Sequence, residues 1–157
     1  MNWDLLIEYA IYFAVIIICV LILLFIKRKN KLPGHTELKS RMENICLQLN
    51  ELSQKTEQTS REFDFFKKVS RVLYALDRLI YEATLISEKE RDVQIGDISA
   101  LLSRARDEVS PYKYGKKEKE DASGFENAAN IVQSAIAIAD SILLRDKALR
   151  SRKSKAK

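Results

Sequence analysis

The stretch between Gly34 and Gly96 contains 61 consecutive residues with neither glycine nor proline. These two residue types are the commonest interruptions of regular helices. Their absence therefore favours long α-helices over the many tight turns that a β-sandwich or barrel needs. The whole chain of 157 residues has only 4 glycines and 2 prolines. The sequence therefore predicts an all-α fold.

A second constraint is the apolar run from Leu5 to Ile26, whose 22 residues include one charged side chain, Glu8. A helix of this length reaches about 33 Å, enough to cross a hydrocarbon core of about 30 Å. The residues before the run are acidic, and no Ala-x-Ala cleavage site follows it. We therefore expect an uncleaved membrane anchor rather than a signal peptide.

Aromatic and basic side chains mark the two ends of this predicted span. Tryptophan and tyrosine prefer the headgroup zone of a bilayer, and lysine and arginine remain on its cytoplasmic side. The residues that set the orientation are Trp3, Tyr9, Tyr12, Lys27, Arg28, Lys29 and Lys31. The pattern predicts a single-pass protein of the cell membrane, with its N-terminus outside and the rest of the chain in the cytoplasm.

The sequence after the anchor is predicted to form a cytoplasmic body of three to four helices. Pro33 and Gly34 interrupt helical structure between anchor and body. The expected segments are an outer terminus and anchor (1–26), a basic hinge (27–35), a coiled-coil-like stalk (36–66), a helical bundle (67–150) and a basic tail (151–157).

The predicted stalk has apolar residues at alternating intervals of three and four, which is the pattern of a coiled coil. Its apolar positions are Leu38, Met42, Ile45, Leu49, Leu52, Phe63 and Phe66, and Thr56 and Thr59 interrupt them. The same pattern fits an amphipathic helix packed within its own bundle. We favour self-association into a homo-oligomer through this seam and keep intramolecular packing as the alternative.

Apolar residues at helical spacing continue through the rest of the body. A capping-box pattern over residues 59–62 predicts a kink or restart of the long helix near residue 60. The charged residues 88–92 are expected to end that helix. Asp97 is expected to cap the next one, Pro111 to stop it, and residues 112–122 to form a polar loop.

The C-terminal segment carries seven basic side chains against one acidic side chain, Asp146. The basic residues are Arg145, Lys147, Arg150, Arg152, Lys153, Lys155 and Lys157. They fit a solvated terminus, a contact with the anionic inner leaflet, or phosphate contacts with nucleic acid. The predicted membrane tether favours the leaflet over nucleic acid.

Catalytic patterns are missing from the sequence. It contains 2 cysteines and 1 histidine, and it has no Walker loop, dinucleotide fingerprint or nucleophile–base motif. The histidine, His35, has no cysteine or carboxylate cluster at metal-ligand spacing. We expect no enzymatic activity, no metal and no cofactor.

These features together predict a membrane-anchored scaffold or adaptor. It would self-associate and recruit an unknown protein partner at the cytoplasmic membrane face. One alternative is a membrane-active protein of the holin-like or pore-forming kind. The other is a membrane tether for nucleic acid that uses the basic tail.

Overall fold

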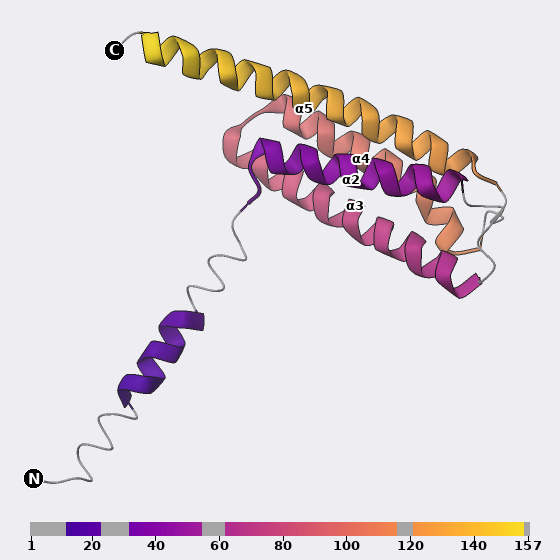
Figure 1. Cartoon of the computed structure of the whole chain (residues 1–157), viewed down its shortest axis with the longest axis horizontal. Helices are drawn as coiled ribbons and strands as arrows, with labels where there is room; N and C mark the ends of the chain where they lie inside the picture. The colour runs from indigo at the N-terminus through magenta and orange to yellow at the C-terminus, as the bar shows by residue number, and fades with distance from the viewer. Residues whose placement is uncertain (1–11, 23–31, 55–61, 116–120, 156–157) are drawn as a thin grey trace, which may run out of the picture. The chain divides into compact units, whose positions relative to one another are not determined.

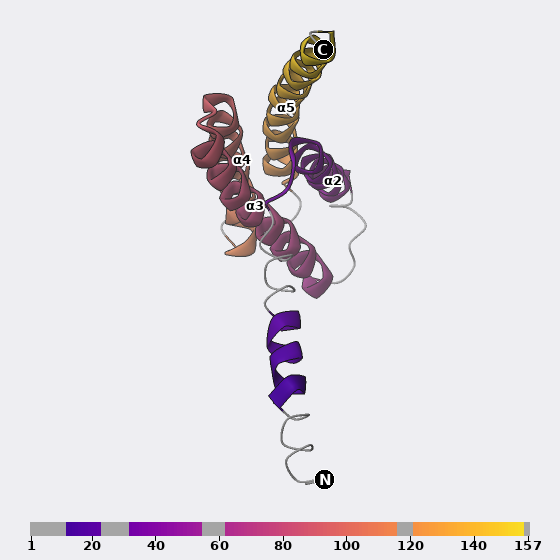
Figure 2. The same ribbon diagram turned by 90° about the vertical axis from the view of Figure 1, so that its left-hand side faces the viewer.

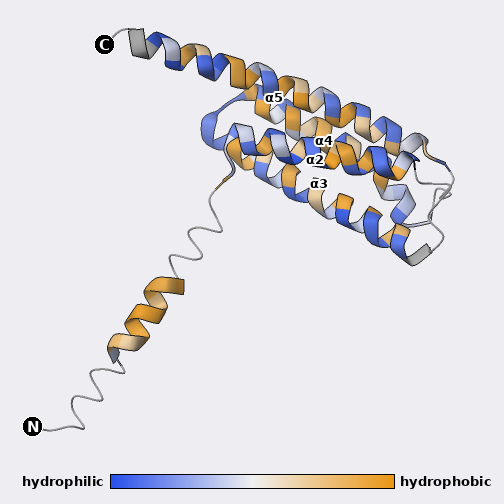
Figure 3. Cartoon of the chain, in the orientation of Figure 1, coloured by the Kyte–Doolittle hydropathy of each residue, from blue (hydrophilic) through white to orange (hydrophobic). Residues whose placement is uncertain are grey.

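The computed structural model describes residues 12–22, 32–54, 62–115 and 121–155 of the chain. These residues form five helices and no strand, which confirms the all-α prediction for the described part. The chain divides into two units, Met1–Leu32 and Pro33–Lys157. Within the first unit, residues Tyr12–Ile22 are helical, and Figure 3 shows them hydrophobic along most of their length.

The second unit, called the body below, consists of four long helices. They are α2 (His35–Gln54), α3 (Glu62–Glu90), α4 (Val93–Lys113) and α5 (Ser123–Lys155). Successive helices run in opposite directions, and α5 lies between α2 and α4 (Figure 1 and Figure 2). The first and last helices therefore pack against each other and close the bundle, while the α2–α3 interface is the smallest of the four.

Each helix contributes one apolar stripe to a common core, as expected for amphipathic helices at 3.6 residues per turn. The residues with the least exposed side chains include Leu38, Met42 and Leu49 of α2; Val69, Val72 and Leu76 of α3; Ile95, Ile98 and Leu102 of α4; and Phe125, Val132 and Ile142 of α5. No described buried side-chain nitrogen or oxygen lacks a hydrogen-bond partner. The body thus has an apolar core, and its described buried polar side-chain atoms find their hydrogen-bond partners within one chain.

The described residues of the predicted stalk 36–66 belong to two helices. The helix α2 ends at Gln54, and α3 begins at Glu62, in agreement with the expected restart near residue 60. Residues 55–61, which include Thr56 and Thr59, lie outside the described residues.

The turn between α3 and α4 corrects the prediction for the cap of α4. Arg91 adopts φ 53°, and the backbone N–H of Asp92 donates to the carbonyl of Ser87 at 3.2 Å. This is the left-handed C-terminal turn that commonly ends helices. The side chain of Asp92 then accepts a hydrogen bond from the N–H of Gln94. Asp92, rather than Asp97, caps α4, because the turn after Glu90 is too tight to leave a longer loop.

Pro111 does not stop α4 where the sequence analysis placed the end of that helix. It lies inside the helix, which continues to Lys113. Proline cannot donate to the carbonyl four residues earlier, here that of Asp107. The hydroxyl of Ser110 donates to that carbonyl at 3.4 Å instead. The missing donor is thereby replaced within the last turns of the helix.

Tyr112 is a core residue, although it was expected in a polar loop. Its ring stacks on that of Phe125 with a centroid distance of 4.0 Å, and its side chain is 1% exposed. Its hydroxyl donates to the carbonyl of Asp121 and accepts from the N–H of Gly124 at 2.9 Å. Burial raises the pKa of Tyr112. This tyrosine therefore joins the end of α4 to the start of α5.

The close approach of α4 and α5 requires glycine at residue 124. A Cβ atom there would lie 2.6 Å from Cε2 of Tyr112 and 3.0 Å from the carbonyl oxygen of Glu108. We expect Gly124→Ala to lower the free energy of unfolding of residues 33–157 by about 2 kcal/mol, since overpacking a core costs about 1–3 kcal/mol. Urea-induced unfolding followed by circular dichroism measures this change.

The matched control is Gly34→Ala. A Cβ atom at Gly34 would meet no atom within 4 Å, so the urea midpoint should stay close to that of the wild type. Equal midpoints for the two variants would contradict the tight α4–α5 contact.

Candidate functional site

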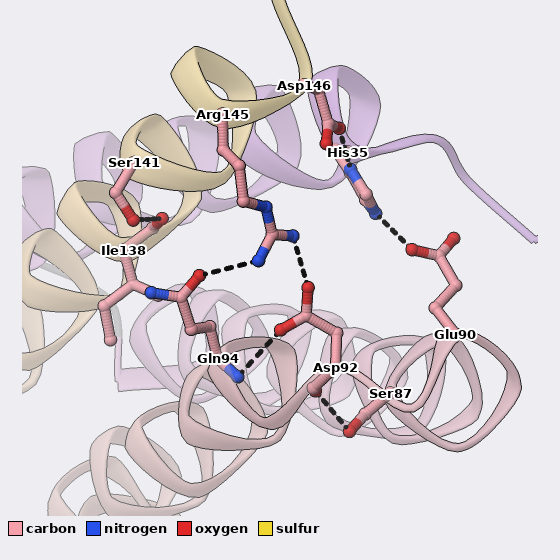
Figure 4. Close-up of polar contacts among 9 residues, drawn as sticks. All are labelled: His35, Ser87, Glu90, Asp92, Gln94, Ile138, Ser141, Arg145 and Asp146. Carbon is pink, nitrogen blue, oxygen red and sulfur yellow. Dashed lines mark hydrogen bonds and ion pairs between the residues drawn. The ribbon is translucent and has the colours of Figure 1, made fainter. Parts of the chain in front are cut away.

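A cluster of charged residues joins three helices at the end of the body where α2 begins (Figure 4). We call His35, Glu90, Asp92, Arg145 and Asp146 the charged clasp. Nδ1 of His35 lies 2.8 Å from a carboxylate oxygen of Asp146, and Nε2 lies 2.9 Å from one of Glu90. Ionised carboxylates only accept hydrogen bonds, so both contacts are satisfied when both ring nitrogens carry hydrogen.

The other half of the clasp joins α5 to the turn between α3 and α4. The guanidinium of Arg145 donates to the carboxylate of Asp92 and, at 3.2 Å, to the side-chain oxygen of Gln94. The hydrogen bond from Arg145 is the main cause that holds the pKa of Asp92 below its usual range, and the N–H of Gln94 contributes to it. The carboxylate of Asp92 thus both caps α4 and forms the ion pair with Arg145.

The clasp changes the interpretation of His35. From the sequence, His35 is expected to lie in a hinge, without a cysteine or carboxylate cluster at metal-ligand spacing. In the structure it is the first residue of α2, and the N–H of Leu38 already donates to the carbonyl of Gly34. The body therefore begins at Pro33, and His35 connects α2 to α3 and α5. The described residues include no group of three or more histidine, cysteine, aspartate or glutamate side chains that could hold a metal ion.

Cys46 faces α5 from the middle of α2. Its Sγ lies 3.8 Å from the carbonyl oxygen of Ala129, and burial raises the pKa of its thiol. A raised pKa disfavours the thiolate, which is the nucleophilic form. The environment of this cysteine is that of a packing residue.

A second ionic cluster spans the small α2–α3 interface. The guanidinium of Arg41 donates to both carboxylate oxygens of Glu82, at 2.6 and 2.8 Å. Arg78 donates to the same carboxylate at 2.9 Å, and Arg41 also contacts Glu37. Glu82 is the one charged side chain among the described residues that is buried. Two arginines therefore balance its charge beside a shallow groove of about 300 Å³.

The surface of α3 that points away from the core carries basic and aromatic side chains together. We call Lys67, Arg71, Tyr74 and Tyr81 the α3 outer face. Tyr74 and Tyr81 are 71% and 65% exposed, and neither Lys67 nor Arg71 forms an ion pair with a described residue. A depression of about 540 Å³ follows the first half of this face, next to Phe66.

The structure places most of the predicted self-association seam inside the body. Leu38, Met42, Ile45, Leu49 and Leu52 are all buried in the core. This is the intramolecular alternative, and it leaves these five side chains inaccessible to a second copy of the folded body. Phe66 is 37% exposed, while nothing of the Phe63 side chain is described.

The residues predicted to orient the protein in a membrane lie almost entirely outside the described residues, with Tyr12 as the exception. By length and composition, one described helical stretch, Ser123–Arg152, could cross a membrane. Its residues Phe125, Val132 and Ile142 are buried in the body, so part of its apolar surface packs in the core. The described part of the predicted anchor, Tyr12–Ile22, is a shorter apolar helix.

The basic C-terminal residues divide into two groups. Arg145 belongs to the charged clasp, so its charge is already paired within the body. Lys147, Arg150 and Arg152 are exposed and form no ion pair with a described residue. Lys153 and Lys155 lie on the last helical turn, and Lys157 is outside the described residues.

Comparison of the chain with models of protein families, with curated proteins and with solved structures finds no match.

Asp92 both caps α4 and pairs with Arg145, which predicts that the free energy of unfolding depends on pH. The substitution Asp92→Asn should keep the helix cap, because asparagine caps helices as well as aspartate does, but it removes the charge pair with Arg145. We expect this variant to have a lower free energy of unfolding of residues 33–157 at pH 7. The pKa of Asp92 is lower in the folded chain than the unfolded value near 4, so the stabilisation is complete above that value. It is lost as the pH falls through the folded pKa.

Urea unfolding of the wild type and Asp92→Asn between pH 7 and pH 2.5 measures this difference. The two stabilities should converge at the acidic end of the range. A difference that stays constant across the whole range would show that the charge pair does not stabilise the fold.

Proposed function

We propose that the protein is a non-enzymatic adaptor, held at the cytoplasmic face of the cell membrane by one spanning helix over residues 5–26. Support for the anchor comes from the length and hydropathy of that run and from the apolar helix Tyr12–Ile22 within it. The basic cluster at residues 27–31 supports a cytoplasmic body. The mechanism is recruitment, since a tether raises the local concentration of a bound partner.

The α3 outer face is the observation that carries the recruiting role. The core of the body is filled by its own four helices, so this face is not needed to complete the fold. Tyrosine and arginine are enriched among the residues that dominate binding energy at protein interfaces. Tyr74 and Tyr81 project into solvent two helical turns apart, and Tyr74 lines the depression together with Lys67 and Arg71.

The geometry of this face favours a helical, acidic partner. Residues 67–81 span about 21 Å along α3, which is about four turns of a partner helix lying along it. Lys67 and Arg71 form no ion pair with a described residue, so acidic side chains of the partner would supply ion-pair partners for them. Self-association through the α2 seam is not part of this proposal, because the seam residues fill the core.

Site-specific photo-crosslinking in intact cells tests the proposal. A benzophenone amino acid replaces Tyr74 or Tyr81, and Tyr114 serves as the matched control, because it is 69% exposed but lies at the end of α4. We expect one adduct of discrete mass in the membrane fraction from residues 74 and 81. We expect no such adduct from residue 114.

Charge variants distinguish a specific contact from a random one. Lys67→Glu combined with Arg71→Glu should abolish the adduct, whereas Arg104→Glu combined with Lys113→Glu should leave it intact. Equal adducts at all three tyrosines, or adducts that survive reversal at 67 and 71, would contradict the recruiting face. An adduct with the mass of two copies would assign the face to self-association, and a chain found only in the soluble fraction would contradict the anchor.

A further inference from the structure

The last helix continues well beyond the core of the body. Among the described side chains of α5, the last buried one is Ile142, yet the helix extends to Lys155. The 13 residues after Ile142 correspond to about 20 Å of helix. Figure 1 shows this end of α5 projecting past the other three helices of the body.

The charged clasp separates this projection from the body. Arg145 and Asp146 pair with Asp92 and His35, so the one acidic side chain of the C-terminal segment is already engaged. After Asp146 the chain contains six basic residues and no acidic residue: Lys147, Arg150, Arg152, Lys153, Lys155 and Lys157. The projection is thus a helix of one charge sign, and its first three cations have no ion-pair partner among the described residues.

The clasp also fixes where the projection begins. His35 is the first residue of α2, and it contacts Asp146 at 2.8 Å. The basic end of α5 therefore leaves the body beside the point where the chain arrives from the predicted anchor. Eight residues separate Ile26 from His35, and eight extended residues reach at most about 30 Å. A linker of that length limits the distance between His35 and a bilayer that residues 5–26 would span.

We propose that residues 147–157 bind the surface of an anionic lipid leaflet and form a second membrane contact of this protein. The proposal rests on the membrane anchorage proposed above. Basic residues near an anionic leaflet each strengthen binding, and one apolar anchor combined with a basic patch is a common pair of membrane signals. At about 100° per residue, Lys147, Arg150 and Arg152 occupy three different directions around α5, so the contact is electrostatic and sensitive to salt.

Energy transfer in lipid nanodiscs tests this contact with the full chain. A donor dye on Ser151→Cys, with Cys19 and Cys46 replaced by serine, reports its distance from acceptor-labelled lipid headgroups. We expect higher transfer in discs with 30% phosphatidylglycerol than in discs of phosphatidylcholine alone. We expect 0.5 M NaCl to remove the difference.

Two variants that each remove three positive charges test whether the response to anionic lipid comes from the tail. Lys147→Gln, Arg150→Gln and Arg152→Gln together should reduce the ratio of bound to unbound tail by about 100-fold. Lys68→Gln, Arg104→Gln and Lys113→Gln together should leave it unchanged, because they remove three exposed charges from α3 and α4 rather than from the tail.

The remaining outcomes contradict the proposal or separate it from the proposed function. Equal transfer in the two lipid compositions would overturn the lipid contact. Binding of the tail to a single-stranded oligonucleotide, without any response to anionic lipid, would assign the same cations to nucleic acid and also overturn it. A chain that is not retained in the discs would contradict the anchor alone. Added vesicles of the same two compositions would then decide the lipid preference of the tail.

Discussion

Burial of the apolar face of α2 against α5 is the interaction on which the rest of the body depends. These are its first and last helices, so their packing closes the bundle. Leu38, Met42 and Leu49 are at most 1% exposed, and burying each such side chain contributes about 1.5–3 kcal/mol. The same closure brings His35 to Asp146 and so positions the charged clasp. It leaves the α3 outer face and the end of α5 as the charged surfaces that the fold does not use.

The apolar stripe of α2 could be predicted from the sequence, but the ends of α4 and the partner of each helix could not. Apolar spacing identified the buried stripe of α2 correctly, including Ile45 and Leu52. A heptad seam has the same appearance whether it meets a second chain or a distant helix of its own chain, because the pattern records burial alone. The partner of this seam, α5, lies about 90 residues further along the chain. A self-associating stalk was therefore favoured, with intramolecular packing as the alternative, where the structure packs α2 against α5.

The site shows the same limit at the level of single residues. His35 contacts residues 55 and 111 positions away, which no local motif reveals. Tyr112 lies in a polar segment, yet it continues the stripe of Ala105 and Val109 at helical spacing, and that spacing was the available signal. The basic residues of the C-terminal segment could be identified from the sequence. The sequence does not show that Arg145 pairs with Asp92 while Lys147, Arg150 and Arg152 form no ion pair with a described residue, because this depends on where the bundle ends.

The mass and solvent protection of the isolated body test the closure of α2 onto α5 most directly. Sedimentation equilibrium of residues 33–157 at about 100 μM, combined with amide hydrogen exchange along α2, measures both. This concentration lies well above the micromolar dissociation constants of ordinary specific contacts. Closure within one chain predicts a monomer whose amides from Met42 to Leu49 exchange slowly. A dimer or larger oligomer, or a monomer in which these amides exchange as fast as in an unfolded chain, would contradict it.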